Sequence, residues 1–254
     1  MNNVLIYFAI KYKGNFNDIY NALKNQEKIS ENELKKIEYK VNNNEIKAFT
    51  ILDDIYPEEF KVLVKPPFVV FYEGNVSILK NKWKIYLTGD EKNNKVNQYL
   101  EQSLKEIAKR YTLITCFYKN LDIDINNFFI TNNSPIIYVS TNGIKNPYFA
   151  DKININENKL IISEYPNEVN ISKNKLKNRN RLAAALSESL IIYSSKIDSG
   201  INNLVTNFLN LGKEIYCFPG DFSDEDGNAN LIKDGANIIT SIKDIYSDER
   251  RKNA

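Results

Sequence analysis

The sequence lacks histidine altogether, and its 254 residues include only two cysteines. Without an imidazole, a Ser-His-Asp triad, a histidine-ligated metal site and histidine acid–base chemistry are all excluded. Cys116 and Cys217 each lie inside an apolar, strand-like stretch. This position favours buried thiols in a reducing compartment over a disulfide or a metal site. We therefore expect no metal and no cofactor.

Long apolar runs are also missing. No stretch approaches the roughly 20 residues that a helix needs to cross a bilayer, and the N-terminus lacks the basic segment of a signal peptide. We therefore expect a cytoplasmic protein with no membrane partner. Hydrophobic residues make up 43% of the chain, which predicts a substantial core, and the formal net charge is only +2. With charge so nearly balanced, only local clustering can indicate a polyanionic partner.

The apolar pattern divides the chain into a helical first part and an α/β remainder. Helical spacing follows Asn17 and Ser30, and Ser30 with Glu33 fits a capping box. From Trp83 onward, near-continuous apolar strands alternate with helices, which predicts a mostly parallel sheet with helices on both faces. The expected strands are 84–89, 112–117, 135–140, 160–164, 190–194 and 214–218, and the clearest helices are 96–110 and 201–211. The expected boundaries are 1–55 for a small helical N-terminal domain, 56–247 for the α/β domain and 248–254 for a flexible tail.

A run of alternating cations precedes an Ala-rich stretch that should be a helix. Every second residue from 173 to 181 is basic, namely Lys173, Lys175, Lys177, Arg179 and Arg181. If the stretch is extended, its period of two places all five on one face, about 6.6 Å apart, leading to a helix N-terminus. A helix N-terminus carries partial positive charge, so cations beside it favour a bound anion such as phosphate. The alternative is a solvated lysine-rich loop.

Three further turns each allow two interpretations, a ligand-binding site or an ordinary structural turn. Gly89 ends the first strand of the expected parallel sheet, where such folds place a phosphate-binding turn. Because Asp90 and Glu91 follow it, a plain strand-to-helix turn is favoured. Ser199-Gly200 lies between a strand and a helix, where it donates N–H groups to an anion or simply caps the helix. The acidic segment 221–226 lacks the spacing of an EF-hand, which favours a solvated turn over a metal site.

Taken in order, these segments resemble the DNA-processing protein A family, also called DprA or Smf. The resemblance covers nearly the whole chain. It rests on Tyr56-Pro57, Pro66-Pro67, residues 71–75, residues 163–166, Arg179-Asn180-Arg181 with Leu186-Ser187, Ser199-Gly200, Gly212-Lys213, Phe218-Pro219-Gly220, Gly227, residues 230–232 and Gly235-Ala236.

This resemblance implies an extended Rossmann-like fold behind a small helical domain. It also implies a dimer that binds single-stranded DNA and helps to load the RecA recombinase during natural transformation, without an established enzymatic activity. Arg179 and Arg181 would contact DNA phosphate with Asn180 beside them, Lys175 would lie in the basic approach, and Gly89 would match the first glycine of a Gly-Ser/Thr-Arg turn. The candidate DNA-binding residues are therefore Lys173, Lys175, Lys177, Arg179, Asn180, Arg181, Gly89, Ser199 and Gly200.

The chain departs from the family pattern at several of these positions. Asp90 and Glu91 replace a hydroxyl residue and an arginine, which removes an expected phosphate contact. Leu176-Lys177 replaces Phe-Pro, which removes an aromatic ring whose stacking on a base is worth ~1–3 kcal/mol, while Lys177 adds a charge. Two alternatives follow. One is a nucleotide-processing, phosphoribohydrolase-like enzyme, although its Pro-Gly-Gly-x-Gly-Thr loop is not visible at residues 218–222. The other is a scaffold that has lost DNA binding.

Overall fold

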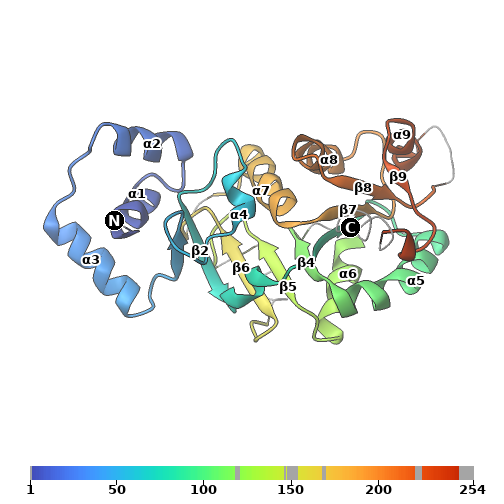
Figure 1. The fold of residues 1–254 in the computed structure, drawn as a ribbon, viewed down its shortest axis with the longest axis horizontal. Coiled ribbons are helices and arrows are strands. Elements are labelled where there is room, and N and C mark those ends of the chain that lie inside the picture. Colours follow the sequence, from blue (N-terminus) through green and yellow to red (C-terminus); the bar gives the residue numbers. More distant parts are fainter. Residues whose placement is uncertain are drawn as a thin grey trace. The chain divides into compact units, whose positions relative to one another are not determined.

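The computed structural model describes residues 2–117, 121–145, 147, 154–167, 170–220 and 225–245. The chain packs as two compact units. The first unit comprises residues 1–80 and 137–179, and the second comprises residues 81–136 and 180–254. Figure 1 labels the helices and strands along the chain. No helix among the described residues has the length and apolar character needed to cross a membrane.

The first unit combines the N-terminal helices with an antiparallel part of the sheet. Its strands follow the order β1-β2-β6-β5, and β2 pairs antiparallel with both β1 and β6. The elements are α1 (Asn2–Lys11), α2 (Phe16–Lys24), α3 (Glu31–Asn42), β1 (Ala48–Thr50), α4 (Glu58–Lys61), β2 (Val69–Gly74), the 3-10 helix η1 (Val76–Lys80), most of β5 (Ile136–Val139), β6 (Lys159–Ser163) and the N-terminal half of α7 (Lys173–Leu186).

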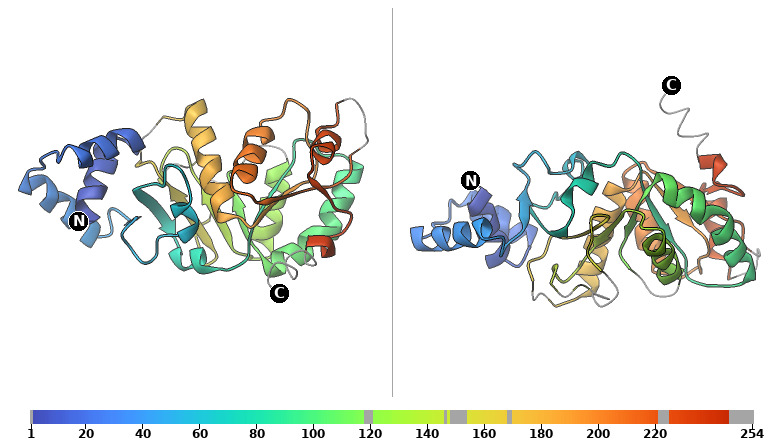
Figure 2. Two further views of the ribbon diagram at one scale, coloured as in Figure 1. Left: turned by 45° about the horizontal axis from the view of Figure 1, so that its top comes forward. Right: turned by 90° about the horizontal axis from the view of Figure 1, so that it is seen from below.

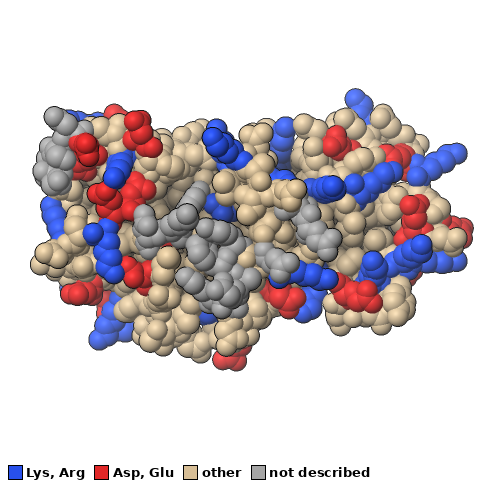
Figure 3. All heavy atoms as spheres, turned by 180° about the vertical axis from the view of Figure 1, so that it is seen from behind, with Lys and Arg blue, Asp and Glu red and all other residues tan. Residues whose placement is uncertain are grey.

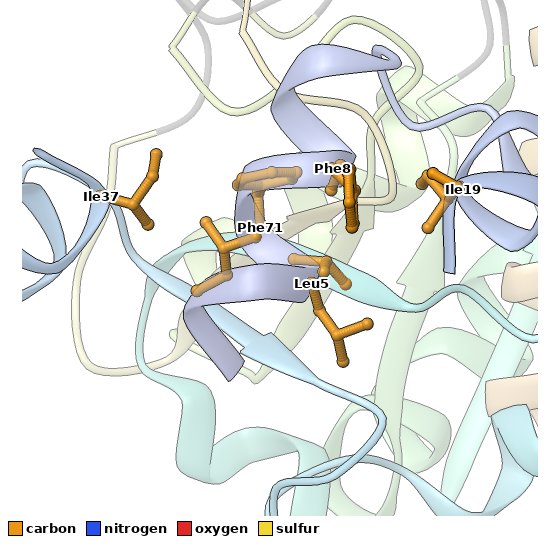
Figure 4. Close-up of a cluster of buried hydrophobic side chains, with 9 residues drawn as sticks. Leu5, Phe8, Ile19, Ile37 and Phe71 are labelled. Carbon is orange, nitrogen blue, oxygen red and sulfur yellow. The ribbon is translucent and has the colours of Figure 1, made fainter. Parts of the chain in front are cut away.

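Helices α1, α2 and α3 lie next to one another in both views of Figure 2 and bury a shared hydrophobic cluster. Leu5, Phe8, Ile19 and Ile37 belong to this cluster together with Phe71 of β2, and Figure 4 shows Ile37 and Ile19 on either side of the other three residues. The predicted capping box of α3 is confirmed, because the Ser30 and Glu33 side chains each accept a hydrogen bond from the other residue's backbone N–H. Since the cluster includes a β2 residue, the helices share their core with the strand that follows. The boundary at 55/56 stays a prediction.

The second unit is the parallel, helix-covered part of the fold. Its strands follow the order β4-β3-β7-β8-β9, and every neighbouring pair is parallel. Figure 1 shows α8 and α9 above these strands and α5 and α6 below them. The elements are β3 (Lys84–Thr88), α5 (Asn94–Arg110), β4 (Thr112–Thr115), α6 (Leu121–Thr131), the C-terminal half of α7 (Lys173–Leu186), β7 (Ser189–Ile192), α8 (Ile201–Asn210), β8 (Glu214–Cys217), α9 (Gly227–Lys233) and β9 (Asn237–Ile238).

The predicted fold class is confirmed: the sheet is mixed and mostly parallel, with helices, in a Rossmann-like α/β arrangement. All residues of β3, β4 and β7 are buried, which explains their near-continuous apolar sequences. Both cysteines are free and buried, and burial raises the pKa of the Cys217 thiol to about 12. The predicted tail at 248–254 and most of the acidic segment 221–226 lie outside the described residues.

The basic stretch differs from the extended conformation considered above. It is helical from Lys173, so a helix N-terminus after Arg181 is wrong. The physical reason is local: Lys173–Leu186 contains no glycine, proline or β-branched residue, and Lys, Arg, Leu and Ala are strong helix formers. The Ser172 hydroxyl accepts a hydrogen bond from the Lys175 N–H at 3.3 Å and thereby helps to start the helix.

Candidate nucleic-acid interface

Helical geometry separates the five cations of α7 onto two faces. At about 100° per residue, Lys173, Lys177 and Arg181 lie on one face, and Lys175 and Arg179 lie on the other. We call the first set the α7 basic face. Lys173 and Lys177 are exposed and Arg181 is half-buried. Neither exposed lysine forms an ion pair with a described residue, and α7 itself contains no carboxylate.

The centre of the Arg-Asn-Arg motif is buried. Asn180 is 1% exposed and donates a hydrogen bond through Nδ2 to Oδ1 of Asn203 in α8, at 2.9 Å. Its own Oδ1 accepts from the Cys116 thiol at 3.8 Å. Arg179 is 4% exposed. Asn180 therefore ties α7 to α8, a role that the sequence did not indicate, while phosphate contact by Arg179 and Arg181 stays a prediction.

Lys213 stabilises the C-terminal end of α7. Its ammonium donates hydrogen bonds to the backbone oxygens of Ala184 at 3.0 Å, Ala185 at 2.6 Å and Ser187 at 2.6 Å. The last carbonyls of a helix have no partner within the helix, and a cation there also interacts favourably with the helix dipole. The only sequence signal was the Gly212-Lys213 pair after α8. Lys213 thus serves structure and was absent from the candidate set.

The turn after β3 uses its backbone N–H groups internally. A Cβ on Gly89 would lie 2.5 Å from Cδ2 of Leu121, so glycine permits a close approach here. The next two residues, Asp90 and Glu91, donate their N–H groups to the carbonyl oxygen and the hydroxyl of Ser194, both at 3.0 Å. The turn therefore resembles an ordinary strand-to-helix connection more closely than an open anion cradle.

The two carboxylates of this turn are also engaged. Asp90 accepts a hydrogen bond from the Lys196 N–H at 2.9 Å, and Glu91 forms a 2.6 Å ion pair with the Lys196 ammonium. The hydrogen bond to Glu91 raises the pKa of Lys196. Because β3 and β7 are adjacent and parallel, the residues after their carboxyl ends meet. The placement of Lys196 four residues after β7 was the signal that could have identified this pairing.

Ser199 bonds to the first residue of α8 from the position before the N-cap, Gly200. Its hydroxyl accepts a hydrogen bond from the Ile201 N–H at 3.0 Å. Gly200 has an ordinary φ of −60°, and a Cβ there would meet nothing within 4 Å. Gly200 is the N-cap residue of α8 and has no side chain to cap it, so only the Ser199 hydroxyl bonds to the start of the helix. Contact of either residue with an anion stays a prediction.

A small cavity of about 160 Å³ lies at the carboxyl ends of β3, β7 and β8. Hydrogen bonds within the protein occupy several of its polar groups: Tyr99 Oη donates to Pro219 O, and Lys95 Nζ donates to Gly220 O. The Tyr99 ring stacks on Phe218 at 4.4 Å between centroids. The cavity is therefore smaller than the pockets that bind small molecules, which usually measure roughly 300–1,000 Å³. The described part of the chain also contains no cluster of three or more side chains that would hold a metal.

Basic and acidic side chains are interspersed on the face shown in Figure 3. This agrees with the formal net charge of +2. This face therefore has no broad field of one sign.

The fold and these motifs define a Rossmann-like α/β protein with a basic helix leading into its parallel strands. The sequence model of DNA recombination-mediator protein A matches residues 47–250. The chain therefore belongs to the DNA recombination-mediator protein A family, and the resemblance inferred from the motifs is confirmed. Helices α1 to α3 precede the matched residues.

Individual relatives agree with this assignment. The chain is 26% identical over 210 residues to the DNA processing protein DprA of Streptococcus pneumoniae, covering 79% of this chain and 73% of that protein. It is 26% identical over 218 residues to DprA of Bacillus subtilis, covering 82% and 73%. The crystal structure of the S. pneumoniae protein superimposes with a TM-score of 0.71 at 21% identity, over 96% of this chain and 92% of that chain.

A second solved structure has the same fold. It concerns the single-stranded DNA binding mode of DNA processing protein A from Helicobacter pylori. It superimposes with a TM-score of 0.69 at 22% identity, over 81% of this chain and 96% of that chain.

Proposed function

We propose that this DNA recombination mediator binds single-stranded DNA, and that the α7 basic face supplies its main phosphate contacts. The observation that carries the proposal is the placement of Lys173, Lys177 and Arg181 at four-residue intervals on one helix face, two of them exposed and without an ion pair to any described residue. A cation without an intramolecular carboxylate partner can pair with phosphate without first breaking a contact. Membership in the family supports DNA as the partner.

The salt dependence of binding to an oligo-dT strand tests the proposal. Each phosphate contact contributes about 0.7 to the slope of log K against log salt for single strands. The double variant Lys173→Gln/Lys177→Gln is therefore expected to lower the slope by about 1.4 and to weaken binding most at low salt. Fluorescence anisotropy at several salt concentrations measures both quantities.

A matched control removes two equivalent charges elsewhere. Lys36 and Lys40 are exposed on α3, four residues apart, and form no ion pair with a described residue. Lys36→Gln/Lys40→Gln should leave the slope unchanged. Equal slopes for the parent and the α7 variant would show that phosphate binds elsewhere.

From family membership, we further propose that the chain forms a homodimer and assists the loading of RecA. Light scattering should then give a mass of about twice that of the 29.4 kDa chain. Addition of the chain should also shorten the lag before RecA hydrolyses ATP on single-stranded DNA covered by single-strand binding protein. A monomeric mass or an unchanged lag would contradict the respective part of this proposal.

One observation favours a scaffold without DNA binding as a second candidate. The turn after β3 has its N–H groups bonded to Ser194, and Glu91 is paired with Lys196. A gel-shift experiment at low salt distinguishes the two functions. Retardation of single-stranded DNA supports the mediator that binds DNA, whereas no retardation combined with an intact dimer supports the scaffold.

A further inference from the structure

We propose that Lys13, in the turn between α1 and α2, binds the DNA backbone together with Lys175 of α7. The inference rests on the proposed function and gives the N-terminal helices a part in the same interface. These helices precede residues 47–250, which carry the family match. All residues of the argument belong to the first unit.

Glycine at position 14 brings the turn into direct contact with the segment after β6. Gly14 has a φ of +73°, and a Cβ there would lie 2.4 Å from the backbone oxygen of Glu164 and 2.9 Å from Cδ1 of Tyr165. The turn is closed by hydrogen bonds from the Gly14 N–H to Ala9 O at 2.8 Å and from the Lys13 N–H to Ile10 O at 3.2 Å. This is the pattern of a Schellman motif. The backbone of Lys13 is therefore held beside Tyr165.

Lys175 lies against the same tyrosine. Its Nζ is 5.3 Å from the centroid of the Tyr165 ring and donates a hydrogen bond to Asn170 O at 2.6 Å. The ring is 4% exposed, and its hydroxyl accepts a hydrogen bond from Nδ2 of Asn178 at 3.4 Å. Tyr165 thus serves as a common support for the turn that contains Lys13 and for the Lys175 ammonium.

The turn that contains Lys13 and the ammonium of Lys175 both lie beside Tyr165. Desolvation, and after it repulsion from Lys13, lowers the pKa of Lys175. Neither lysine forms an ion pair with a described residue. Lys11 provides the contrast, because it lies only two residues away and pairs with Glu27 at 2.6 Å. A phosphate beside Lys13 and Lys175 would reduce the repulsion between the two ammonium groups, and this favours an anionic ligand at the site.

The first test compares Lys13→Asn with Lys28→Asn. Asparagine tolerates the left-handed backbone of Lys13, which has a φ of +50°, so folding should be retained. Lys28 is an exposed lysine in the connection between α2 and α3, with no ion pair to a described residue. Lys13→Asn is expected to lower the salt slope for oligo-dT by about 0.7, so that its affinity falls behind that of the parent by a further factor of about five for each tenfold decrease in salt.

The outcomes separate the inference from the proposed function. If the parent and Lys28→Asn bind with the full slope and Lys13→Asn has the reduced slope, the inference is supported. If all three bind equally, the inference is wrong and the proposed function stands. If the parent fails to bind single-stranded DNA at low salt, both are wrong.

A second measurement needs no DNA. NMR titration of the Lys175 side chain should show a higher pKa in Lys13→Asn than in the parent, because a neighbouring positive charge has been removed, and no change in Lys28→Asn. An unchanged Lys175 pKa in Lys13→Asn would overturn the proposed juxtaposition, whatever the DNA measurements give.

Discussion

Lys173 and Lys177 on the α7 basic face form no ion pair with a described residue, whereas Lys196, beside the turn after β3, is bound to Glu91 at 2.6 Å. The sequence marked both regions as possible phosphate sites. In the second region, Asp90 and Glu91 connect the loops after β3 and β7, and Ser194 occupies the N–H groups that an anion would need. The comparison shows that two basic segments with similar sequence signals differ in ion pairing: Lys196 is paired with a carboxylate, whereas Lys173 and Lys177 have no ion pair to a described residue.

The largest expected effect is on the free energy of unfolding and comes from a buried lysine. Burial is a third environment for a cation in this protein, after exposure to solvent and ion pairing. Lys159, at the start of β6, is 2% exposed, and burial lowers its pKa from 10.5 to about 8. At pH values between about 8 and 10.5, the unfolded chain binds more protons at Lys159 than the folded chain does. The free energy of unfolding should therefore increase as pH rises from about 8 to 10.5, by roughly 2–3 kcal/mol.

Denaturant titrations at several pH values, compared with Lys159→Met, isolate this contribution. Methionine keeps most of the apolar stem but cannot titrate, so the increase attributed to Lys159 should be absent. A parent and a variant with parallel pH profiles would contradict the assigned burial.

Lys213 is expected to have the next largest effect on stability, because its ammonium is hydrogen-bonded to three backbone oxygens at the end of α7. Lys213→Met removes three hydrogen bonds to the end of α7 and should lower the free energy of unfolding by about 2 kcal/mol, since water replaces part of the lost contacts. Lys233→Met is the control, because Lys233 is an exposed residue in the last turn of α9. Chemical denaturation should show less than about 0.5 kcal/mol for the control. Equal losses of unfolding free energy in Lys213→Met and Lys233→Met would contradict a stabilising role of Lys213 at the end of α7.

The smallest effect is expected from a substitution that releases Lys196, beside the turn after β3, from its ion pair. Glu91→Gln removes the carboxylate that pairs with Lys196, and because the pair is more than half exposed, stability should change by less than about 1 kcal/mol. The released Lys196 should strengthen oligo-dT binding at low salt and add up to about 0.7 to the salt slope.

The matched control for this variant is Glu58→Gln, which releases Lys61 from a similarly exposed pair on α4. Anisotropy titrations should show no gain for this control. Equal behaviour of Glu91→Gln and Glu58→Gln would mean that the turn after β3 lies away from the DNA.

Much of the fold could be predicted from the sequence because its signals are local. The strands β3, β4, β7 and β8 follow from continuous apolar runs, and the α3 capping box follows from Ser30 and Glu33. Helix α1 was missed because seven consecutive apolar residues hide a helical period. The basic stretch was misjudged because an alternation of charge was treated as a strand period, although its residues are good helix formers.

The candidate site depended on contacts that the sequence does not contain. Asn180 was expected beside phosphate, but its burial against Asn203 joins two helices more than 20 residues apart in sequence. Lys13 was not a candidate, because nothing in its neighbours indicates that Gly14 packs on Tyr165. Both contacts join residues that are far apart in the chain, and neither the composition nor the hydrophobic periodicity of the sequence indicates which distant residues meet.

The sequence by itself determined the α/β class, the buried thiols and the motifs of the DNA recombination-mediator protein A family, since residue type and short-range periodicity govern these features. Only the tertiary structure decided which cations are neutralised, which are buried and which face solvent. The free energy of a charge depends on the carboxylates, carbonyls and water within a few ångströms of it, and folding alone brings those groups together.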